Sequence, residues 1–426
     1  MGLKPPIRVG GFFRVYGRLS FSIKVGLLHS GLIWRKKMKF KKLLLSLASV
    51  VTLAACGSVT STTSSSDAAE SDTINIGGNF ALTGSASAYG SYINDGATLA
   101  FNEINAAGGI NGKQINYVST DNKSNVQEAA NEATRLLEDE NLSVLLSSDI
   151  AASTEASIQP AQNAKVPMII PSATVDDLTL DSSGNVFDYI FQIAFQISNQ
   201  TKALGAFADN KGWTTAAVLQ DNSSDYGQNL ATQFEEDFSG EVVAKESFIS
   251  GDTDFNSILS NIKAQDPDVL FIAGYYPEGG AIVKQAREMG IDAAILGPNG
   301  LGNDEFVKLA GAENVTDFYY ATIFVTGEYG TDAANEFAER YEAEFGKEAD
   351  LFSAGGYDAA MIAADAIERA GSTDPEAIRD ALETTTDFAG VTGNISFDED
   401  HNPVMDSFVV GYQDGEISSV EPVSAE

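Results

Sequence analysis

The chain has 426 residues, with 26 Lys and Arg against 60 Asp and Glu and a formal net charge of −34. A protein this acidic repels phosphate backbones and anionic lipid, which argues against nucleic-acid binding and against membrane attachment through basic patches. With one cysteine the chain can form no internal disulfide, so a hydrophobic core must hold the fold, and the length predicts two domains of ordinary size.

The first 37 residues differ in composition from the rest of the chain. They hold eight Lys or Arg and no Asp or Glu, and Met38 would serve as a start by itself. We expect residues 1–37 to be an extension from an upstream start codon, the alternative being an unusually long basic leader, and exclude them from reasoning about the fold.

Residues 38–55 have the order of a secretory signal peptide: a basic start, "MKFKK", then an apolar run and small residues. The apolar run is shorter than the roughly 20 residues that a membrane-spanning helix needs. It ends in "LAAC", which resembles the bacterial lipobox, whose cysteine is lipidated and becomes the first mature residue. We therefore expect a lipid on Cys56 and a flexible Ser/Thr-rich tether over residues 56–72. The alternative, a buried free cysteine after a core helix, fits the polar spacer poorly.

From Thr73 onward, strand-like and helix-like segments alternate. The strand-like segments of the first series are "TINIGGNFAL", "QINYVSTD", "LSVLLSSD" and "VPMIIPSAT". Between them, apolar residues at helical spacing predict helices over about 93–104, 126–137 and 154–163. Such alternation is typical of a parallel sheet covered by helices.

A second series follows "FDYIFQIA". Its strand-like segments are "TTAAVLQD", "EVVAKESF", "DVLFIAG" and "AAILGPN", with helices predicted over about 226–238, 255–262 and 282–289. Long helices are predicted over 332–345 and 353–370, and the chain closes on "GNISFD" and a hairpin with its turn at Asp414-Gly415. The predicted fold class is therefore α/β, with two Rossmann-like lobes and a ligand cleft between them.

The segments that follow the strands are rich in small hydroxyl residues, Gly and Tyr. They read "LTGSASAYG", "SSDIAAST", "PSAT", "QDNSSDYG", "AGYYPEGG" and "LGPNG". Each alone is compatible with an ordinary turn between a strand and a helix. In open parallel sheets, however, ligands bind at the carboxyl ends of strands, so their shared placement predicts a cleft that captures a small molecule.

Several blocks resemble one known family. "GGNFALTGSASAYG", "NAAGGINGK", "DNSSDYGQNL", "DVLFIAGYYPEGGAIVKQAREMGI" and "GNISFDEDHNP" are similar to type I periplasmic-binding-protein-like solute receptors, in the branched-chain amino acid group of ABC importers. The resemblance implies two lobes joined by three crossovers. One lobe would comprise residues 73–193 plus 324–389, and the other residues 194–323 plus 390–420.

The resemblance also implies a set of ligand-binding residues. The substrate carboxylate would meet backbone N–H and hydroxyl groups at Ala151, Ala152, Ser153, Ser172 and Thr174. A helix that begins near Ser153 would offer unpaired N–H donors to an anion without a basic residue. The aromatic side chains that close over the ligand would be Tyr89, Tyr226 and Tyr275.

One position departs from the family pattern. The leucine/isoleucine/valine-binding protein has an acid that pairs with the substrate ammonium, where this chain has Asn299. An amide accepts a hydrogen bond from an ammonium but cannot neutralise it. Either Glu278 or Asp225 in neighbouring loops supplies the charge, or the ligand is not a simple amino acid.

The sequence favours a binding protein over an enzyme. It lacks the common nucleophile, phosphate-loop, zinc-protease and dinucleotide motifs, and "FDEDHNP", which contains His401, fits a hairpin turn better than a calcium loop. We expect no catalytic residue, cofactor or metal. The expected protein is an exported monomer, lipid-anchored on the outer face of the cytoplasmic membrane, whose partners are ABC permease subunits with cytoplasmic ATPases. The alternative is a lipid-anchored sensor or co-receptor on the same fold.

Overall fold

The computed structural model describes residues 73–423. The predicted signal peptide, the lipidation site at Cys56 and the tether up to residue 72 lie outside the described residues and stay predictions. Among the described residues, no helix combines the length and the apolarity needed to span a bilayer.

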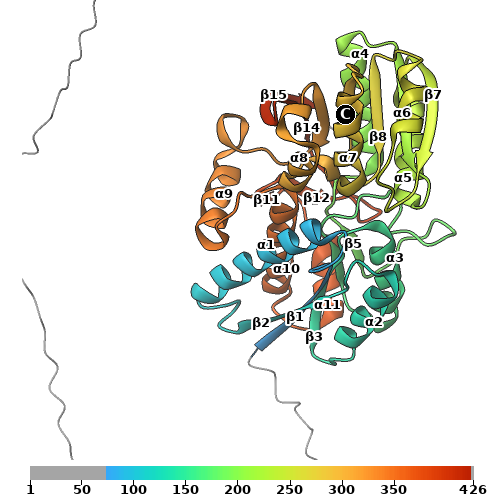
Figure 1. Cartoon of the computed structure of the whole chain (residues 1–426). Helices are drawn as coiled ribbons and strands as arrows, with labels where there is room; N and C mark the ends of the chain where they lie inside the picture. The colour runs from blue at the N-terminus through green and yellow to red at the C-terminus, as the bar shows by residue number, and fades with distance from the viewer. Residues whose placement is uncertain (1–72, 424–426) are drawn as a thin grey trace, which may run out of the picture. The chain divides into compact units, whose positions relative to one another are not determined.

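The first lobe is built on a parallel sheet with the strand order β2-β1-β3-β4-β5. Its strands are β1 (Thr73–Phe80), β2 (Gln114–Asp121), β3 (Leu142–Ser147), β4 (Met168–Ile170) and β5 (Ile190–Gln192). Every residue of β3 is buried, because helices cover both faces of the sheet. The helices that follow the first three strands are α1 (Ser87–Ala106), α2 (Val126–Leu137) and α3 (Ala151–Ala164). In Figure 1, α1 lies on one side of this sheet and α2 and α3 lie on the other.

The second lobe contains a larger sheet with the order β15-β14-β10-β9-β8-β6-β7. Its parallel strands are β6 (Thr215–Asp221), β7 (Glu241–Phe248), β8 (Val269–Ala273), β9 (Ala294–Gly297) and β10 (Phe318–Thr322), and the antiparallel strands β14 (Ser407–Gln413) and β15 (Glu416–Val423) complete it. The predicted turn between the last two strands is confirmed, with Asp414 and Gly415 both at positive φ.

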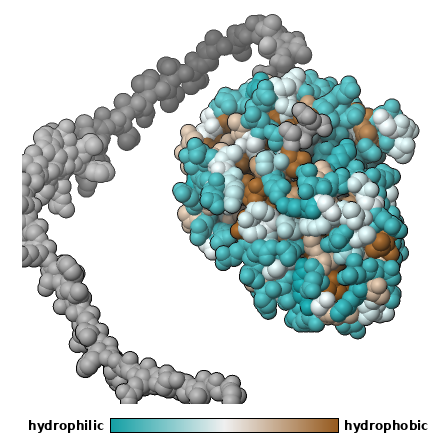
Figure 2. Space-filling model, turned by 90° about the horizontal axis from the view of Figure 1, so that it is seen from above, coloured by the Kyte–Doolittle hydropathy of each residue, from teal (hydrophilic) through white to brown (hydrophobic). Residues whose placement is uncertain are grey.

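Helices also cover the second sheet. They are α4 (Ile197–Lys211), α5 (Asp225–Asp237), α6 (Asn256–Lys263), α7 (Tyr276–Glu288) and α8 (Asp304–Ala310), together with the short 3₁₀ segments η1 (Asn299–Leu301) and η2 (Ala312–Asn314). On the face shown in Figure 2, hydrophilic residues cover most of the surface, as expected for so acidic a chain.

After β10 the chain returns to the first lobe. It forms η3 (Gly327–Tyr329), α9 (Asp332–Phe345), α10 (Leu351–Ala370) and α11 (Pro375–Glu383), then a small sheet of β11 (Phe388–Gly390), β12 (Gly393–Phe397) and β13 (Pro403–Val404). Within the described residues the chain thus passes between the lobes three times, before α4, after β10 and before β14. The predicted fold class, two α/β lobes joined by three crossovers, is confirmed.

The small sheet lies against the first lobe. His401, in the turn between β12 and β13, contacts the Ile190 carbonyl at 3.0 Å through Nδ1 and stacks on Phe191 at 4.2 Å between ring centroids. The division expected from the sequence places residues 390–420 in the second lobe. The contacts of His401 instead attach the small sheet to the first lobe. The bounds of the two lobes stay a prediction.

Helices α1 and α10 pack closely enough for their backbones to touch. A Cβ atom added at Gly96 would lie 2.0 Å from the Ser353 carbonyl oxygen, and one added at Gly356 would lie 2.1 Å from that of Ile93. Only glycine fits at such contacts. Helix α10 starts with a capping box, in which Asp350 and Ser353 bond each other's backbone N–H. The close packing of α1 against α10 holds the C-terminal helices on the first lobe.

Candidate ligand-binding site

A cavity lies where the carboxyl ends of the two sheets face each other. Its lining comes from Tyr89, Asp149, Ile150, Ala151, Ser172, Ala173, Thr174 and Phe352 in the first lobe, and from Tyr226, Tyr275, Asn299 and Gly300 in the second. About 270 Å³ of space, mouth included, is free of protein atoms. This is the position where ligands bind in open α/β sheets.

The cavity brings together seven of the ten residues that the sequence predicts for the ligand site. They are Tyr89, Ala151, Ser172, Thr174, Tyr226, Tyr275 and Asn299. The other three do not line it. Ala152 is exposed on α3, and Ser153, in the first turn of that helix, is fully buried. Glu278 is buried in α7, where its carboxylate accepts a hydrogen bond from the Gly251 N–H at 2.8 Å.

Two tyrosine hydroxyls of the second lobe lie near polar groups of the first. The Tyr275 hydroxyl lies close to the backbone of Ala151, and the Tyr226 hydroxyl lies close to the Thr174 side chain. Burial raises the pKa of both phenols, so both stay neutral. Their rings stack at 4.6 Å between centroids. The groups expected to bind a substrate carboxylate therefore lie close to tyrosine hydroxyls of the opposite lobe.

Tyr89 of the first lobe forms hydrogen bonds to the backbone of the second lobe. Its hydroxyl donates to the Gly300 carbonyl at 3.0 Å and accepts from the Tyr276 N–H at 3.2 Å. Its ring packs against Phe352 and, edge to face, against Tyr276, with centroids 4.5 and 5.1 Å away. The Tyr276 hydroxyl in turn donates to the Ser85 carbonyl at 2.9 Å. Sequence reasoning missed Tyr276 and Phe352, although Tyr276 adjoins the predicted Tyr275 in "GYYPEGG".

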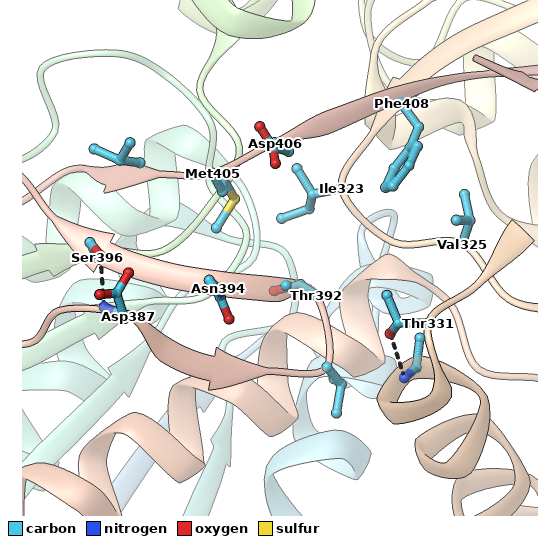
Figure 3. Close-up of a pocket in the computed structure, with 14 residues that line it drawn as sticks. Ile323, Val325, Thr331, Asp387, Thr392, Asn394, Ser396, Met405, Asp406 and Phe408 are labelled. Carbon is cyan, nitrogen blue, oxygen red and sulfur yellow. Dashed lines mark hydrogen bonds between the residues drawn. The ribbon is translucent and has the colours of Figure 1, made fainter. Parts of the chain in front are cut away.

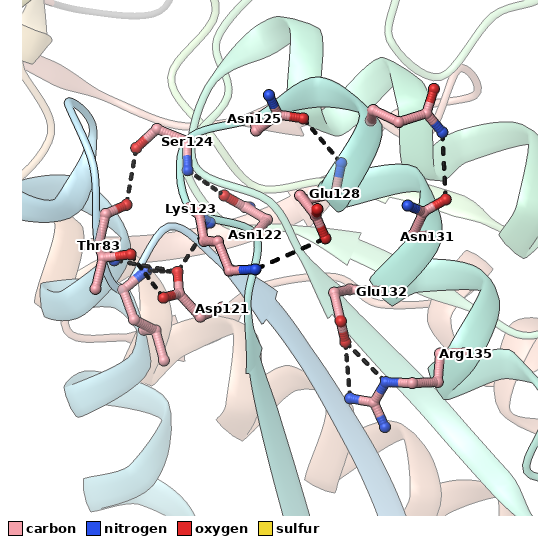
Figure 4. A network of polar contacts seen from close by, with 12 residues as sticks. Thr83, Asp121, Asn122, Lys123, Ser124, Asn125, Glu128, Asn131, Glu132 and Arg135 are labelled. Carbon is pink, nitrogen blue, oxygen red and sulfur yellow. Dashed lines mark hydrogen bonds and ion pairs between the residues drawn. The ribbon is translucent and has the colours of Figure 1, made fainter.

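A polar network fixes the loop that leads to Tyr89. The Asp121 carboxylate, at the end of β2, accepts hydrogen bonds from the backbone of Leu82 and Lys123 and from the backbone and hydroxyl of Thr83 (Figure 4). Although burial acts in the opposite direction, these donors hold the pKa of Asp121 below its usual value. Ser124 adds a bond from its hydroxyl to the Thr83 carbonyl at 3.0 Å. The start of α1 is therefore held by several bonds at once.

The acid that belongs to the cavity is Asp149, which sequence reasoning did not single out. It follows β3 and is 3% exposed. Its carboxylate accepts hydrogen bonds from the Ala81 N–H, from the Ile150 N–H at 2.9 Å and from the Ser148 hydroxyl at 3.2 Å. Burial raises the pKa of Asp149 to about 6. The sequence contains the signal for it, because Asp149 stands in the loop "SSDIAAST", which the small residues already mark as part of the cleft.

A second, larger cavity lies among the segments that cross between the lobes. Figure 3 shows residues that line this cavity: Ile323 and Val325 on one crossover, Met405 and Asp406 on another, and Phe408 in β14. None of the predicted site residues lines this cavity. Crossover segments thus form part of its wall, and residues of α9 and β12 form another part.

Residues 73–416 match the sequence profile described as periplasmic binding protein. The chain belongs to the periplasmic binding protein family. Among its relatives is a protein of Pseudomonas aeruginosa named leucine-, isoleucine-, valine-, threonine-, and alanine-binding protein. It is 32% identical over 333 residues, which are 77% of this chain and 86% of the relative.

Solved structures support the assignment of this periplasmic binding protein to the branched-chain amino acid group. The branched-chain amino acid transporter substrate binding protein LivJ of Streptococcus pneumoniae, solved in complex with isoleucine, is 40% identical with a TM-score of 0.79, over 82% of this chain and 99% of LivJ. A leucine binding protein, LivK of Thermotoga maritima, is 31% identical with a TM-score of 0.75, over 82% of this chain and 98% of LivK. The resemblance found in the sequence is confirmed.

Proposed function

We propose that this protein captures a branched-chain or similar hydrophobic amino acid by closure of its two lobes and delivers it to the permease of an ABC importer. The observation that carries the proposal is the composition of the cavity: hydroxyl and backbone groups from one lobe face aromatic rings from the other. The names of the relatives at 32% and 40% identity support the same ligand class.

The carboxylate end of the ligand would bind to the first lobe. Ala151 opens helix α3, whose first N–H groups have no partner within the helix and carry the positive end of its dipole. The Thr174 hydroxyl is the second donor. Both groups lie close to tyrosine hydroxyls of the second lobe, so the carboxylate would bind beside those hydroxyls.

The aliphatic part of the ligand would pack against aromatic rings of both lobes. Tyr89 and Phe352 come from the first lobe, and Tyr226 and Tyr275 come from the second. A ligand between the lobes would add to the direct contacts that already join them, because its apolar surface is then removed from water on both sides.

Delivery to a membrane permease requires the protein to work outside the cytoplasm. The signal-peptide pattern of residues 38–55 supports export, and "LAAC" supports attachment through a lipid on Cys56. The partners would be permease subunits with cytoplasmic ATPases, and the protein would act as a monomer.

A lipid-anchored sensor or co-receptor for a different small molecule is the second candidate. Asn299 favours it, because this amide lines the cavity yet cannot neutralise an ammonium. A ligand without a free amino group would not need the missing charge.

Isothermal titration calorimetry with leucine, isoleucine and valine tests the first proposal. A binding protein should take up one ligand per chain, and thermal unfolding should show about 2.7 kcal/mol of stabilisation at a ligand concentration of 100 Kd. Small-angle scattering should show compaction. Absence of binding for all three amino acids contradicts the proposal and favours the second candidate.

A further inference from the structure

The proposed function leaves one electrostatic requirement unmet. An α-amino acid carries an ammonium as well as a carboxylate, and burying an ammonium between two lobes costs free energy unless an opposite charge lies beside it. Asn299 occupies the position where the family resemblance implies an acid, and its amide is neutral. The inference that follows rests on the proposed function, since it concerns the ligand's amino group.

The acids considered from the sequence do not reach the cavity. Glu278 is bound to the Gly251 N–H, and Asp225 is exposed at the start of α5. Asp221, at the end of β6, accepts bonds from Ser223 and Ser224 and does not line the cavity either. Of the described residues that line the cavity, Asp149 alone carries a carboxylate, and the lining includes no Lys, Arg or His.

The hydrogen bonds of Asp149 leave room for one more donor. A carboxylate has about four acceptor positions. Oδ1 accepts from the Ile150 N–H and the Ser148 hydroxyl, whereas Oδ2 accepts from the Ala81 N–H. One position on Oδ2 therefore stays open to a charged donor. The three existing bonds also hold the carboxylate in place between the ends of β1 and β3, which lowers the entropic cost of binding.

The position of Asp149 suits the geometry of an amino acid. It stands two residues before Ala151, whose backbone is a proposed partner of the ligand carboxylate. The ammonium and carboxylate of an α-amino acid are attached to the same carbon, so their partners must also be neighbours. Asp149 lies close enough to the Tyr275 hydroxyl for its charge to raise the pKa of that phenol, after burial and the neighbouring Tyr226 and Asp221.

We infer that Asp149 supplies the counter-charge for the ligand's ammonium, from the first lobe, in place of an acid at Asn299 in the second. A buried carboxylate that no cation of the cavity neutralises gains most from an incoming positive charge. Asp149 is thus a specificity-determining residue that favours ligands with a free amino group.

The test compares two ligands that differ in that group, leucine and 4-methyl-2-oxopentanoate. Calorimetry should show that the wild-type protein prefers leucine, and the near-isosteric Asp149→Asn substitution should lower this preference at least about tenfold. Asp358→Asn is the matched control. Asp358 is also buried, accepts three hydrogen bonds from Val391 and Thr392 and lies outside the cavity. It should leave the preference unchanged.

The wild-type comparison covers the case in which Asp149→Asn folds poorly, because equal affinity of the wild type for leucine and 4-methyl-2-oxopentanoate would by itself overturn the inference. A double variant adds a test in which the preference is regained. Asp149→Asn combined with Asn299→Asp moves the carboxylate to the opposite lobe and should restore the preference for leucine. Loss of affinity for both ligands by the same factor in Asp149→Asn would mean that Asp149 only ties the strands together, which overturns the inference. A wild-type protein that binds neither ligand, nor isoleucine or valine, instead contradicts the proposed function.

Discussion

Replacement of Thr174 by valine tests the proposed carboxylate site most directly. Thr174 is 4% exposed and lines the cavity, and its side chain lies close to the Tyr226 hydroxyl of the other lobe. Its carbonyl accepts from the Ile197 N–H at 2.8 Å, which holds the backbone whatever the side chain is. Valine has nearly the same shape as threonine, so the substitution removes a hydroxyl and little else.

The expected loss follows from the hydrogen bond that disappears. A bond to a charged acceptor contributes about 1.5–3 kcal/mol, because the ligand carboxylate is left with an unfilled acceptor position in a closed cavity. This range corresponds to a rise in Kd of about 10- to 150-fold. Any contribution of the Tyr226 contact to closure would add to the loss.

The assay is calorimetric titration of leucine into the wild type and two comparison variants. Thr174→Ser keeps the hydroxyl and should restore most of the affinity. Thr179→Val makes the same change at another buried threonine, whose hydroxyl bonds Asn402 at 3.1 Å outside the cavity, and should leave Kd within about twofold. Unchanged affinity in Thr174→Val, or an equal loss in Thr179→Val, would refute the placement of the carboxylate at Thr174.

The remaining predictions concern stability and attachment. Gly356→Ala should lower the free energy of unfolding by about 1–3 kcal/mol in denaturant titrations, because its methyl group would overlap the Ile93 carbonyl. Gly279→Ala should cost less, because its methyl group would meet side-chain atoms of Leu301 and Phe306 and no backbone atom. Equal stabilities of the two variants would contradict this reasoning. Burial raises the pKa of Asp358 to about 6, above its value in the unfolded chain. The contribution of Asp358 to stability is therefore complete below pH 4 and is lost as the pH rises through 6. In thermal unfolding, the free energy of unfolding of the wild type relative to Asp358→Asn should fall by about 1–3 kcal/mol between pH 4 and pH 7. A constant difference would show that the carboxyl ionises normally. Cys56→Ala should release the protein from the membrane fraction, and equal retention would argue against a lipid anchor.

Local patterns in the sequence were sufficient for most of the elements. Helices predicted over 126–137 and 332–345 have those bounds in the structure, since their caps and apolar spacing are encoded within a few residues. The turn at Asp414-Gly415 needs positive φ at two adjacent positions, which these residue types tolerate. The sequence predicts a helix start at residue 353, whereas α10 starts at Leu351. The difference of two residues arises because the cap depends on the pairing of Asp350 with Ser353.

The sequence by itself also determined which loops form the site, because strand ends of parallel sheets share one edge. It did not determine the direction of every side chain in those loops. Glu278 and Asp149 are both acids beside strand ends, yet the first turns to the Gly251 N–H and the second lines the cavity. Tyr89 meets Gly300 across more than 200 residues of sequence. Only the tertiary structure decided these contacts, because the direction of a side chain depends on packing between two lobes whose partners are far apart in the chain.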